Sequence, residues 1–213
     1  MKYNTTRFTG NNKKMEKILF FALLLLSFTT YSQNLDIRIL RQINEHRSVN
    51  LDGTFKTISG SVSPISIGAP LLIIGTGLIE KDKELKQKGL VVAESFLVTT
   101  LVATGLKHAI NRPRPFETYP DIQKLSAGGS SSFPSGHTSD AFSTATSLSL
   151  AFPKWYVIAP SYVYASAVGY SRMHLGVHYP SDVLAGAIVG AGSAFICYKA
   201  QTWLNHRNRK NHK

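Results

Sequence analysis

The chain has 213 residues, which suits a single domain, and 43% of them are hydrophobic. Its only cysteine, Cys197, excludes an internal disulfide and a cysteine-rich metal site. The formal net charge of +12 lies largely near the two ends of the chain and is not interleaved with a motif that reads nucleic acid. Basic ends around apolar segments are typical of membrane proteins, so we expect a membrane, and no nucleic acid, as a partner.

The N-terminal part of the chain predicts a targeting segment. Residues 1–14 are polar, and Met15 opens a short charged stretch that precedes the apolar run 18–28. That run has the length of a signal-peptide core, and the small and polar residues 29–33 can hold a cleavage site, although they lack an Ala-x-Ala pattern. A cleaved signal peptide and an uncleaved anchor therefore both stay open. Because the stretch at Met15 directly precedes the apolar run, we expect the functional chain to begin there.

Residues 35–59 mix charged side chains with apolar ones at helical spacing, among them Leu35, Ile39 and Ile43. This pattern predicts one or two amphipathic helices that lie on a membrane surface or cover a bundle. No alternation typical of a strand is convincing here or later in the chain, so we expect an all-α fold.

Five apolar segments follow, at 57–79, 89–106, 141–153, 155–171 and 183–198, and Glu94 is their only charged residue. Several are shorter than the about 20 residues that a perpendicular membrane span needs, but flanking residues can extend them. We expect an antiparallel bundle of about five to six helices that crosses a membrane, and the alternative is a soluble bundle with very apolar core helices. The expected organisation is an N-terminal extension with the targeting segment (1–33), the helical domain (34–200) and a basic tail (201–213).

Polar residues gather in three clusters, each at the end of an apolar segment. They occupy residues 107–115, residues 134–137 and residues 171–182. If successive segments run antiparallel, all three clusters lie at the same end of the bundle. We therefore expect one site to be built from all of them.

The first ingredient of this site is positive charge. Lys107, Arg114 and Arg172 supply cations, and both the planar guanidinium fork and the compact ammonium suit phosphate oxygens. Pro134 is a favoured first helical residue, so Ser135, Gly136 and His137 are expected in a first turn whose backbone N–H groups bind anions. The pattern predicts a phosphate site.

The second ingredient is a pair of histidines. His178 lies just ahead of the helix that Pro180 is expected to open, and Asp182, four residues on, can accept from one of its ring nitrogens and leave the other to attack. His137 has no such partner nearby in sequence and is better placed to protonate a leaving oxygen. There is no cluster of carboxylates for Mg²⁺ and no repeated histidine spacing, so we expect no metal and no other cofactor.

The three clusters resemble the type-2 phosphatidic acid phosphatase superfamily, which also includes bacterial acid phosphatases and vanadium haloperoxidases. The family pattern is Lys, six residues, Arg-Pro; then Pro-Ser-Gly-His; then Ser-Arg, five residues, His, three residues, Asp. Every specified residue is present in that order, from Lys107 to Pro115, from Pro134 to His137, and from Ser171 to Asp182. The resemblance covers about residues 57–199.

This resemblance implies that His178 is the nucleophile that forms a phosphohistidine, that Asp182 orients it, and that His137 is the general acid. It implies a phosphate held by Lys107, Arg114, Ser135, Gly136 and Arg172. The implied reaction is metal-independent hydrolysis of a phosphomonoester or pyrophosphate on a bacterial envelope lipid. By the charge of its loops, the site is expected on the periplasmic or outer face of the inner membrane.

Three other functions are compatible with some of these features. They are a soluble, secreted, nonspecific acid phosphatase of the same superfamily, a vanadate-dependent haloperoxidase, and a membrane scaffold that only binds phosphate. The scaffold is disfavoured because His178, Asp182 and His137 add nothing that a simple anion site requires. Near the clusters, His108 and His174 are expected to be structural, and Arg112 is equally suited to a lipid head group or to substrate phosphate.

Overall fold

The computed structural model describes residues 35–211, so the targeting segment expected at 1–33 and the start expected at Met15 lie outside the described residues. Residues 35–45 are helical. A compact unit begins at Leu40, and the helices and the site described below lie within it. Its further elements are η2 (Val49–Leu51), α2 (Asp52–Gly60), α3 (Val62–Ile79), α4 (Lys83–Ile110), α5 (Pro115–Thr118), α6 (Gly136–Ala151), α7 (Trp155–His174) and α8 (Pro180–Asn211). Strands are absent from the described residues, and the prediction of an all-α bundle is confirmed.

The residues at the two ends of helix α4 fix the position of the first polar cluster, residues 107–115. Asp82 caps its start by accepting hydrogen bonds from the backbone N–H groups of Glu84 and Leu85, at 2.8 and 3.0 Å. The helix ends at Asn111, which adopts the left-handed conformation with φ of 46°, a common way to stop a helix. Pro113 follows and cannot continue the helical hydrogen bonding. The chain therefore turns away just after Lys107, and Arg114 leaves the helix toward its neighbours.

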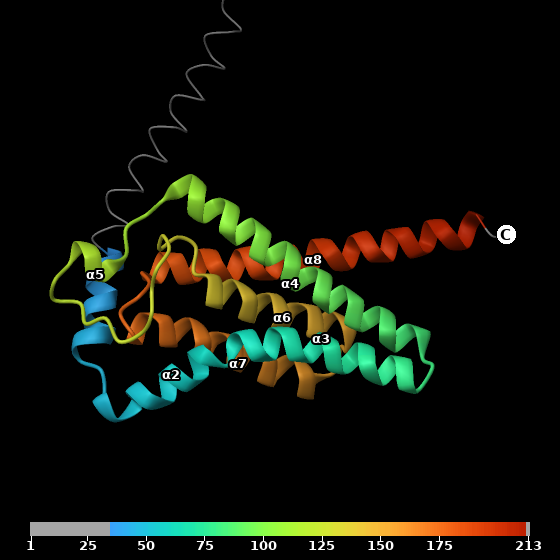
Figure 1. Cartoon of the computed structure of the whole chain (residues 1–213), viewed down its shortest axis with the longest axis horizontal. Coiled ribbons are helices and arrows are strands. Elements are labelled where there is room, and N and C mark those ends of the chain that lie inside the picture. The colour runs from blue at the N-terminus through green and yellow to red at the C-terminus, as the bar shows by residue number, and fades with distance from the viewer. Residues whose placement is uncertain (1–34, 212–213) are drawn as a thin grey trace, which may run out of the picture. The chain divides into compact units, whose positions relative to one another are not determined.

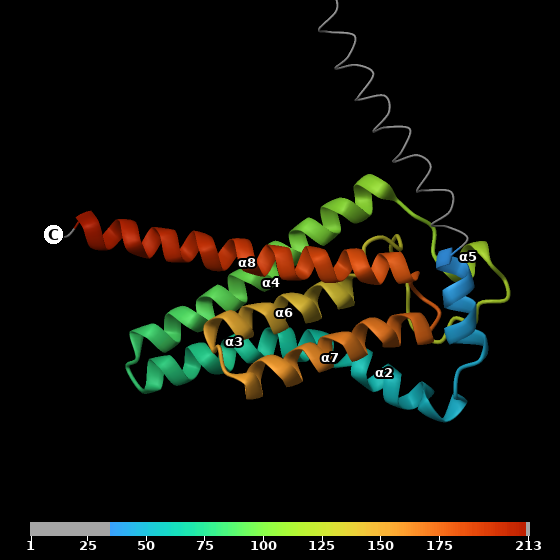
Figure 2. The same cartoon turned by 180° about the vertical axis from the view of Figure 1, so that it is seen from behind.

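From α3 onward the long helices alternate in direction, as Figure 1 and the reverse view in Figure 2 show. Helices α3 and α4 form a hairpin, and α6 lies at the centre in contact with α3, α4, α7 and α8. The ends of α4 and α7 and the starts of α6 and α8 consequently meet at the same end of the bundle. This confirms that the three polar clusters share one end.

The central helix α6 is only 16 residues long, and nearly all of its buried residues are Ser, Thr or Ala. Small side chains allow close approach, since a side chain in place of Gly190 on α8 would meet the carbonyl oxygen of Ser139. The hydroxyls bond across helices, from Thr99 to Ser143 and from Thr144 to Ser66, both at 2.9 Å. Packing of this kind holds helices together inside a membrane, where apolar burial gives little preference for neighbouring helices over lipid.

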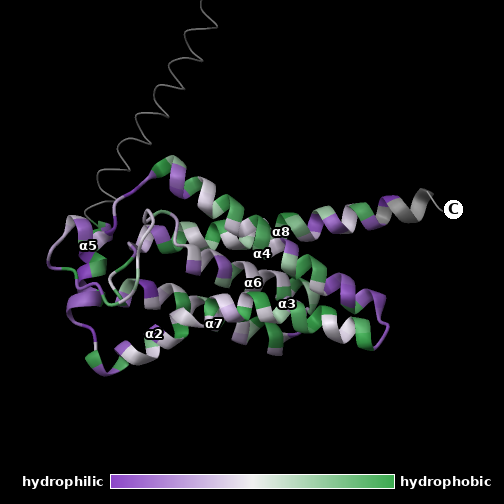
Figure 3. Ribbon diagram, viewed as in Figure 1, coloured by the Kyte–Doolittle hydropathy of each residue, from purple (hydrophilic) through white to green (hydrophobic). Residues whose placement is uncertain are grey.

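Within the described residues, three helical stretches are long and apolar enough to cross a membrane: Val49–Ile79, Lys83–Thr118 and Pro180–Asn205. Their outer faces expose large apolar side chains, for example Leu72 (73%), Leu101 (73%) and Ile188 (64%), and Figure 3 shows in green how many residues of the helices are apolar. A soluble protein rarely exposes so much contiguous apolar surface. The sequence predicted five apolar segments; of the two helices left, α6 is too short at 16 residues and α7 is not apolar enough over its 20 residues.

The end of the bundle remote from the motifs is basic and aromatic. The turn between α3 and α4 carries exposed Lys81 and Lys83, and Lys154 precedes α7. Trp155 and Tyr156, which begin α7, are 79% and 60% exposed. Exposed Trp and Tyr beside lysines are typical of a membrane–water interface.

Candidate active site

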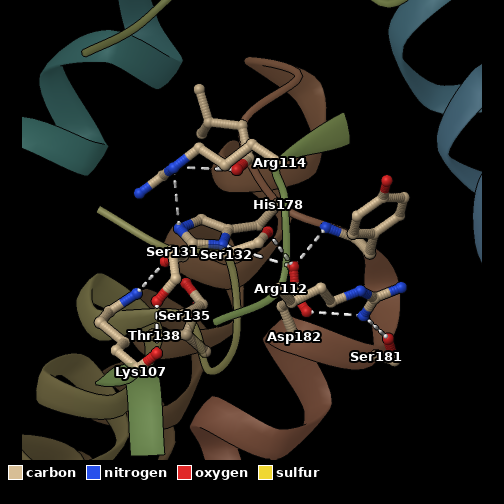
Figure 4. Close-up of polar contacts among 12 residues, drawn as sticks. Lys107, Arg112, Arg114, Ser131, Ser132, Ser135, Thr138, His178, Ser181 and Asp182 are labelled. Carbon is tan, nitrogen blue, oxygen red and sulfur yellow. Dashed lines mark hydrogen bonds and ion pairs between the residues drawn. The ribbon is translucent and has the colours of Figure 1, made fainter. Parts of the chain in front are cut away.

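Three segments that are far apart in sequence converge at one end of the bundle (Figure 4). Lys107 comes from the last turn of α4, Arg114 from the chain just after it, Ser135 from the N-cap of α6, and His178 from the turn between α7 and α8. A backbone hydrogen bond of 3.0 Å from Ser135 N to Asp182 O joins the starts of α6 and α8. The structure thus brings the sequence-predicted residues together.

His178 is buried, and its two ring nitrogens face different partners. Nε2 lies 3.5 Å from Nη1 of Arg114, which can only donate, so Nε2 presents its lone pair and Nδ1 carries the proton. Nδ1 faces Oδ2 of Asp182 at 3.6 Å, just beyond hydrogen-bond length, and has no other partner among the described residues. Catalytic contacts are often this loose before substrate binds. The lone pair of Nε2 therefore points toward the cations.

Burial lowers the pKa of His178 to about 3, against the opposing effect of the Asp182 carboxylate and with help from Arg172 and Arg114. The imidazole is therefore neutral at physiological pH. A neutral imidazole keeps the lone pair that a nucleophile requires.

Asp182 is fully buried and is held by three donors. Its Oδ2 accepts from the backbone N–H of Tyr179 at 2.9 Å and from the hydroxyl of Ser132 at 2.5 Å. Its Oδ1 forms an ion pair of 2.7 Å with Nη1 of Arg112. The orientation predicted for Asp182, folded back from the first turn of α8 toward His178, is present in the structure.

The cations of the site are held by neutral oxygens. Nζ of Lys107 donates to the carbonyl of Ser131 at 2.7 Å, and Nε of Arg114 donates to the carbonyl of Ser130 at 2.7 Å. Arg172, which is 2% exposed, donates to the hydroxyl of Ser59. None of the three cations forms an ion pair with a carboxylate of the described residues.

Their charges consequently act on one another. Lys107 experiences repulsion from both arginines, and Arg172 experiences repulsion from Arg114. In addition, Nε of Arg172 is buried with no acceptor among residues 35–211. Buried positive charge that is neither neutralised nor fully hydrogen-bonded is costly, and a multiply charged anion would relieve both penalties.

Helix α6 starts two positions later than predicted. Pro134 was expected to open the helix, but Ser135 is its N-cap, with φ of −69° and ψ of 109°, and Gly136 is the first helical residue. The carbonyl of Ser135 accepts from the backbone N–H of Ser139, and its hydroxyl accepts from the hydroxyl of Thr138 at 2.8 Å, so the helical hydrogen bonding begins at Ser135 and Pro134 lies outside the helix. The backbone N–H groups of this first turn have no intrahelical partner and can bind an anion beside Lys107.

His137 lies in this first turn and is half-buried. The charges of Arg172, Arg114 and Lys107 all act on its imidazole. The histidine predicted as the acid therefore shares the space of the cations with His178.

Other polar residues near the site have structural partners. The ring of His174 lies 2.8 Å from Oδ1 of Asp52, and that of His108 lies 2.8 Å from the carbonyl of Thr104, as expected of structural histidines. Arg112 was expected to meet a head group or substrate phosphate, but it binds Asp182. The sequence reasoning also missed the loop residues Ser130, Ser131 and Ser132, for which the only signal was a serine-rich stretch between two motifs.

The chain also matches known proteins in sequence and in structure. A family model described as the PAP2 superfamily matches residues 88–206. The chain belongs to the PAP2 superfamily. This confirms the resemblance carried by the three motifs, and the matched residues contain all of them.

Relatives of this PAP2 chain include membrane proteins. A transmembrane PAP2-type phosphatidylglycerolphosphate phosphatase from Bacillus subtilis is similar in structure with a TM-score of 0.69 and 29% identity, over 88% of this chain and 95% of that one. Undecaprenyl-diphosphatase of Sulfolobus acidocaldarius is 30% identical over 60% of this chain and 62% of its own length. Lipid A 1-phosphatase of Porphyromonas gingivalis is 31% identical over 84% of this chain and 37% of its own.

The chain thus aligns with less than two thirds of the length of these last two relatives. Its helices that can cross a membrane and its transmembrane structural neighbour identify the PAP2 chain as an integral membrane protein.

Proposed function

We propose that this PAP2 protein hydrolyses a phosphomonoester or pyrophosphate on an envelope lipid through a phosphohistidine on His178. One observation carries the proposal. The lone pair of a buried, neutral imidazole faces Arg114 among three cations that no described carboxylate neutralises. Such a site can bind an anion with several oxygens and place it beside the nucleophile His178.

In the first step, Nε2 of His178 attacks phosphorus while the bond from phosphorus to the lipid oxygen breaks. His137 gives its proton to that leaving oxygen, and the lipid product departs. Lys107, Arg114 and Arg172 balance the charge on the phosphoryl oxygens, which is the main requirement of phosphoryl transfer. Asp182 stabilises the positive charge that the phosphorylated imidazole acquires, because its Oδ2 faces the Nδ1 proton.

In the second step, His137 takes a proton from water, and the water oxygen attacks phosphorus. The bond between phosphorus and Nε2 breaks, inorganic phosphate leaves, and His178 returns to its neutral form. The positive field of the site comes from side chains and a helix start, so this mechanism requires no metal. Metal independence itself remains a prediction.

The nature of the lipid is proposed from the relatives. Their names specify phosphatidylglycerolphosphate, undecaprenyl diphosphate and lipid A as substrates. All three join a phosphate or pyrophosphate to a membrane-embedded lipid. The apolar outer faces of α3, α4 and α8 suit a substrate that enters from the membrane beside the site.

The direct test is a release assay with detergent-solubilised protein against short-chain versions of these lipids. We expect inorganic phosphate to be released from at least one of them at an unchanged rate in excess EDTA. Vanadate should compete with the substrate, because it mimics five-coordinate phosphorus. Complete loss of activity in EDTA, restored by Mg²⁺, would contradict the mechanism.

We further propose that the site faces the periplasm or exterior. Lysines dominate the opposite end of the bundle, and cytoplasmic loops carry an excess of Lys and Arg. The basic residues of the site lie on the side that this rule disfavours, but we propose that they are there to bind the substrate phosphate.

Single cysteines test this orientation in intact cells. In a Cys197→Ser background, Lys124→Cys reports the exposed loop on the side of the site, and Lys83→Cys reports the turn between α3 and α4. A membrane-impermeant maleimide should label position 124 and leave position 83 unlabelled until the cells are lysed. The reverse pattern would place the site in the cytoplasm.

A further inference from the structure

Arg112 lies outside the three family motifs, yet it contacts the residue that orients the nucleophile. Its Nη1 lies 2.7 Å from Oδ1 of Asp182 and donates to the hydroxyl of Ser181 at 2.7 Å. Figure 4 shows its guanidinium on the side of Asp182 away from the imidazole of His178. It therefore does not face the nitrogen that attacks phosphorus.

The two oxygens of Asp182 have different tasks. Oδ2 faces Nδ1 of His178 and accepts from Ser132 and Tyr179. Oδ1 is bound on its far side by Arg112. Because donors bind both oxygens, rotation of the carboxylate would break hydrogen bonds on either side, and Arg112 thus helps to keep Oδ2 directed at the imidazole.

Arg112 is itself fixed by two further contacts. Its guanidinium stacks on the ring of Tyr179, with Cζ 3.9 Å from the ring centre. Its carbonyl accepts a hydrogen bond of 2.8 Å from the backbone N–H of Ser132, the residue that also binds Asp182. The end of α4, the loop before α6 and the start of α8 are thus joined at one carboxylate. A planar guanidinium stacks its face on the ring while its edge donates to two oxygens, and the compact ammonium of a lysine has no planar fork with which to reproduce this geometry.

We propose that Arg112 is a positioning residue of the phosphatase, acting on His178 through Asp182. It holds Oδ1 so that Oδ2 keeps the Nδ1 proton in place and Nε2 keeps its lone pair toward the phosphoryl group. The proposal rests on the function proposed above. It predicts an effect on the chemical step and little effect on substrate binding.

The test compares Arg112→Gln and Arg112→Lys with Lys124→Gln, which removes an exposed cation at the same end of the bundle. Each is assayed with p-nitrophenyl phosphate and with the lipid substrate. We expect Arg112→Gln to lower kcat about 10- to 100-fold, as the loss of a residue that supports an oriented histidine does elsewhere. KM should change by less than about twofold, and the factor should be the same for both substrates. Arg112→Lys should recover little, and Lys124→Gln should behave as the wild type.

A double-mutant cycle separates a role through Asp182 from an independent one. In an Asp182→Asn background, Arg112→Gln should lower kcat by less than about twofold, because its target is already lost. Should Arg112→Gln unfold the protein in detergent, Ser181→Ala, which removes one bond to the guanidinium, should lower kcat in the same manner by a smaller factor.

Three results would overturn the proposal: an unchanged kcat for Arg112→Gln, a rise in KM confined to the lipid substrate, or the full loss of kcat repeated in the Asp182→Asn background. The second would make Arg112 a head-group contact, and the third would make it independent of Asp182. If His178→Ala still abolishes activity in these cases, the proposed function stands and only the role of Arg112 fails.

Discussion

Replacing His178 by alanine is expected to abolish turnover, with kcat lower by at least about 10⁴-fold, as loss of a covalent nucleophile costs in other enzymes. No other group of the site can replace His178 as the nucleophile, because Nε2 of His178 carries the buried lone pair that faces Arg114. Binding should persist, since the three cations remain. The assay is phosphate release under saturating substrate, with vanadate affinity as the measure of binding.

His108→Ala is the matched control for this experiment. His108 is an exposed histidine in the last turn of α4, next to Lys107, and its ring bonds to the carbonyl of Thr104 in its own helix. It should retain wild-type kcat. Substantial turnover by His178→Ala would mean that another residue attacks phosphorus.

The second large effect is expected from Asp182→Asn, with kcat lower by about 10³- to 10⁴-fold and KM nearly unchanged. The carboxylate accepts from Arg112, Ser132 and Tyr179 and faces the Nδ1 proton. An amide has only one accepting oxygen, so its NH₂ group must meet a donor on one side. Either the imidazole turns or it changes tautomer, and Nε2 then loses its lone pair toward phosphorus.

Asp121→Asn provides the control, because Asp121 is a partly exposed carboxylate at the same end that pairs with Arg41 at 2.6 Å. Loss of that exposed pair should leave kcat within about twofold of the wild type, as surface ion pairs contribute little. If Asp182→Asn retained most of its activity, the orienting role of the carboxylate would be wrong. Equal losses in both variants would indicate a general effect of charge.

Much of the site could be predicted because its residues sit at fixed offsets on helix ends. Asp182 lies four residues after His178 across the start of α8, and this spacing alone turns the carboxylate back toward the imidazole. Lys107 and Arg114 likewise have a fixed spacing in sequence, and they flank the end of α4. Alternation of the helices then brings these ends together, which counting apolar segments was enough to predict.

The contacts that support the site could not be predicted, because they depend on backbone conformation in irregular segments. The carbonyls of Ser130 and Ser131 bind Arg114 and Lys107, and any residue type has such a carbonyl. The contact between Ser59 and Arg172 joins helices that are distant in sequence. Side-chain identity carries no signal for interactions of these two kinds.

Hydropathy was similarly limited for the membrane helices. It depends on composition, so it marks 141–153 as apolar but does not show that the hydroxyls of α6 bond to neighbouring helices. Thr99 and Ser143 are polar in sequence but are mutually satisfied in the bundle. The central position of α6 became apparent only from the three-dimensional packing.

The central claim, a phosphate bound covalently to Nε2 of His178, is tested most directly by trapping the intermediate. His137→Ala with ³²P-labelled p-nitrophenyl phosphate should accumulate it, because this leaving group needs no proton while water still needs a base. Trypsin should place acid-labile, alkali-stable label on the peptide 173–199, and fragmentation should assign it to His178 and not to His174. Label on any other residue, or label that persists when His178 is also replaced by alanine, would contradict the mechanism.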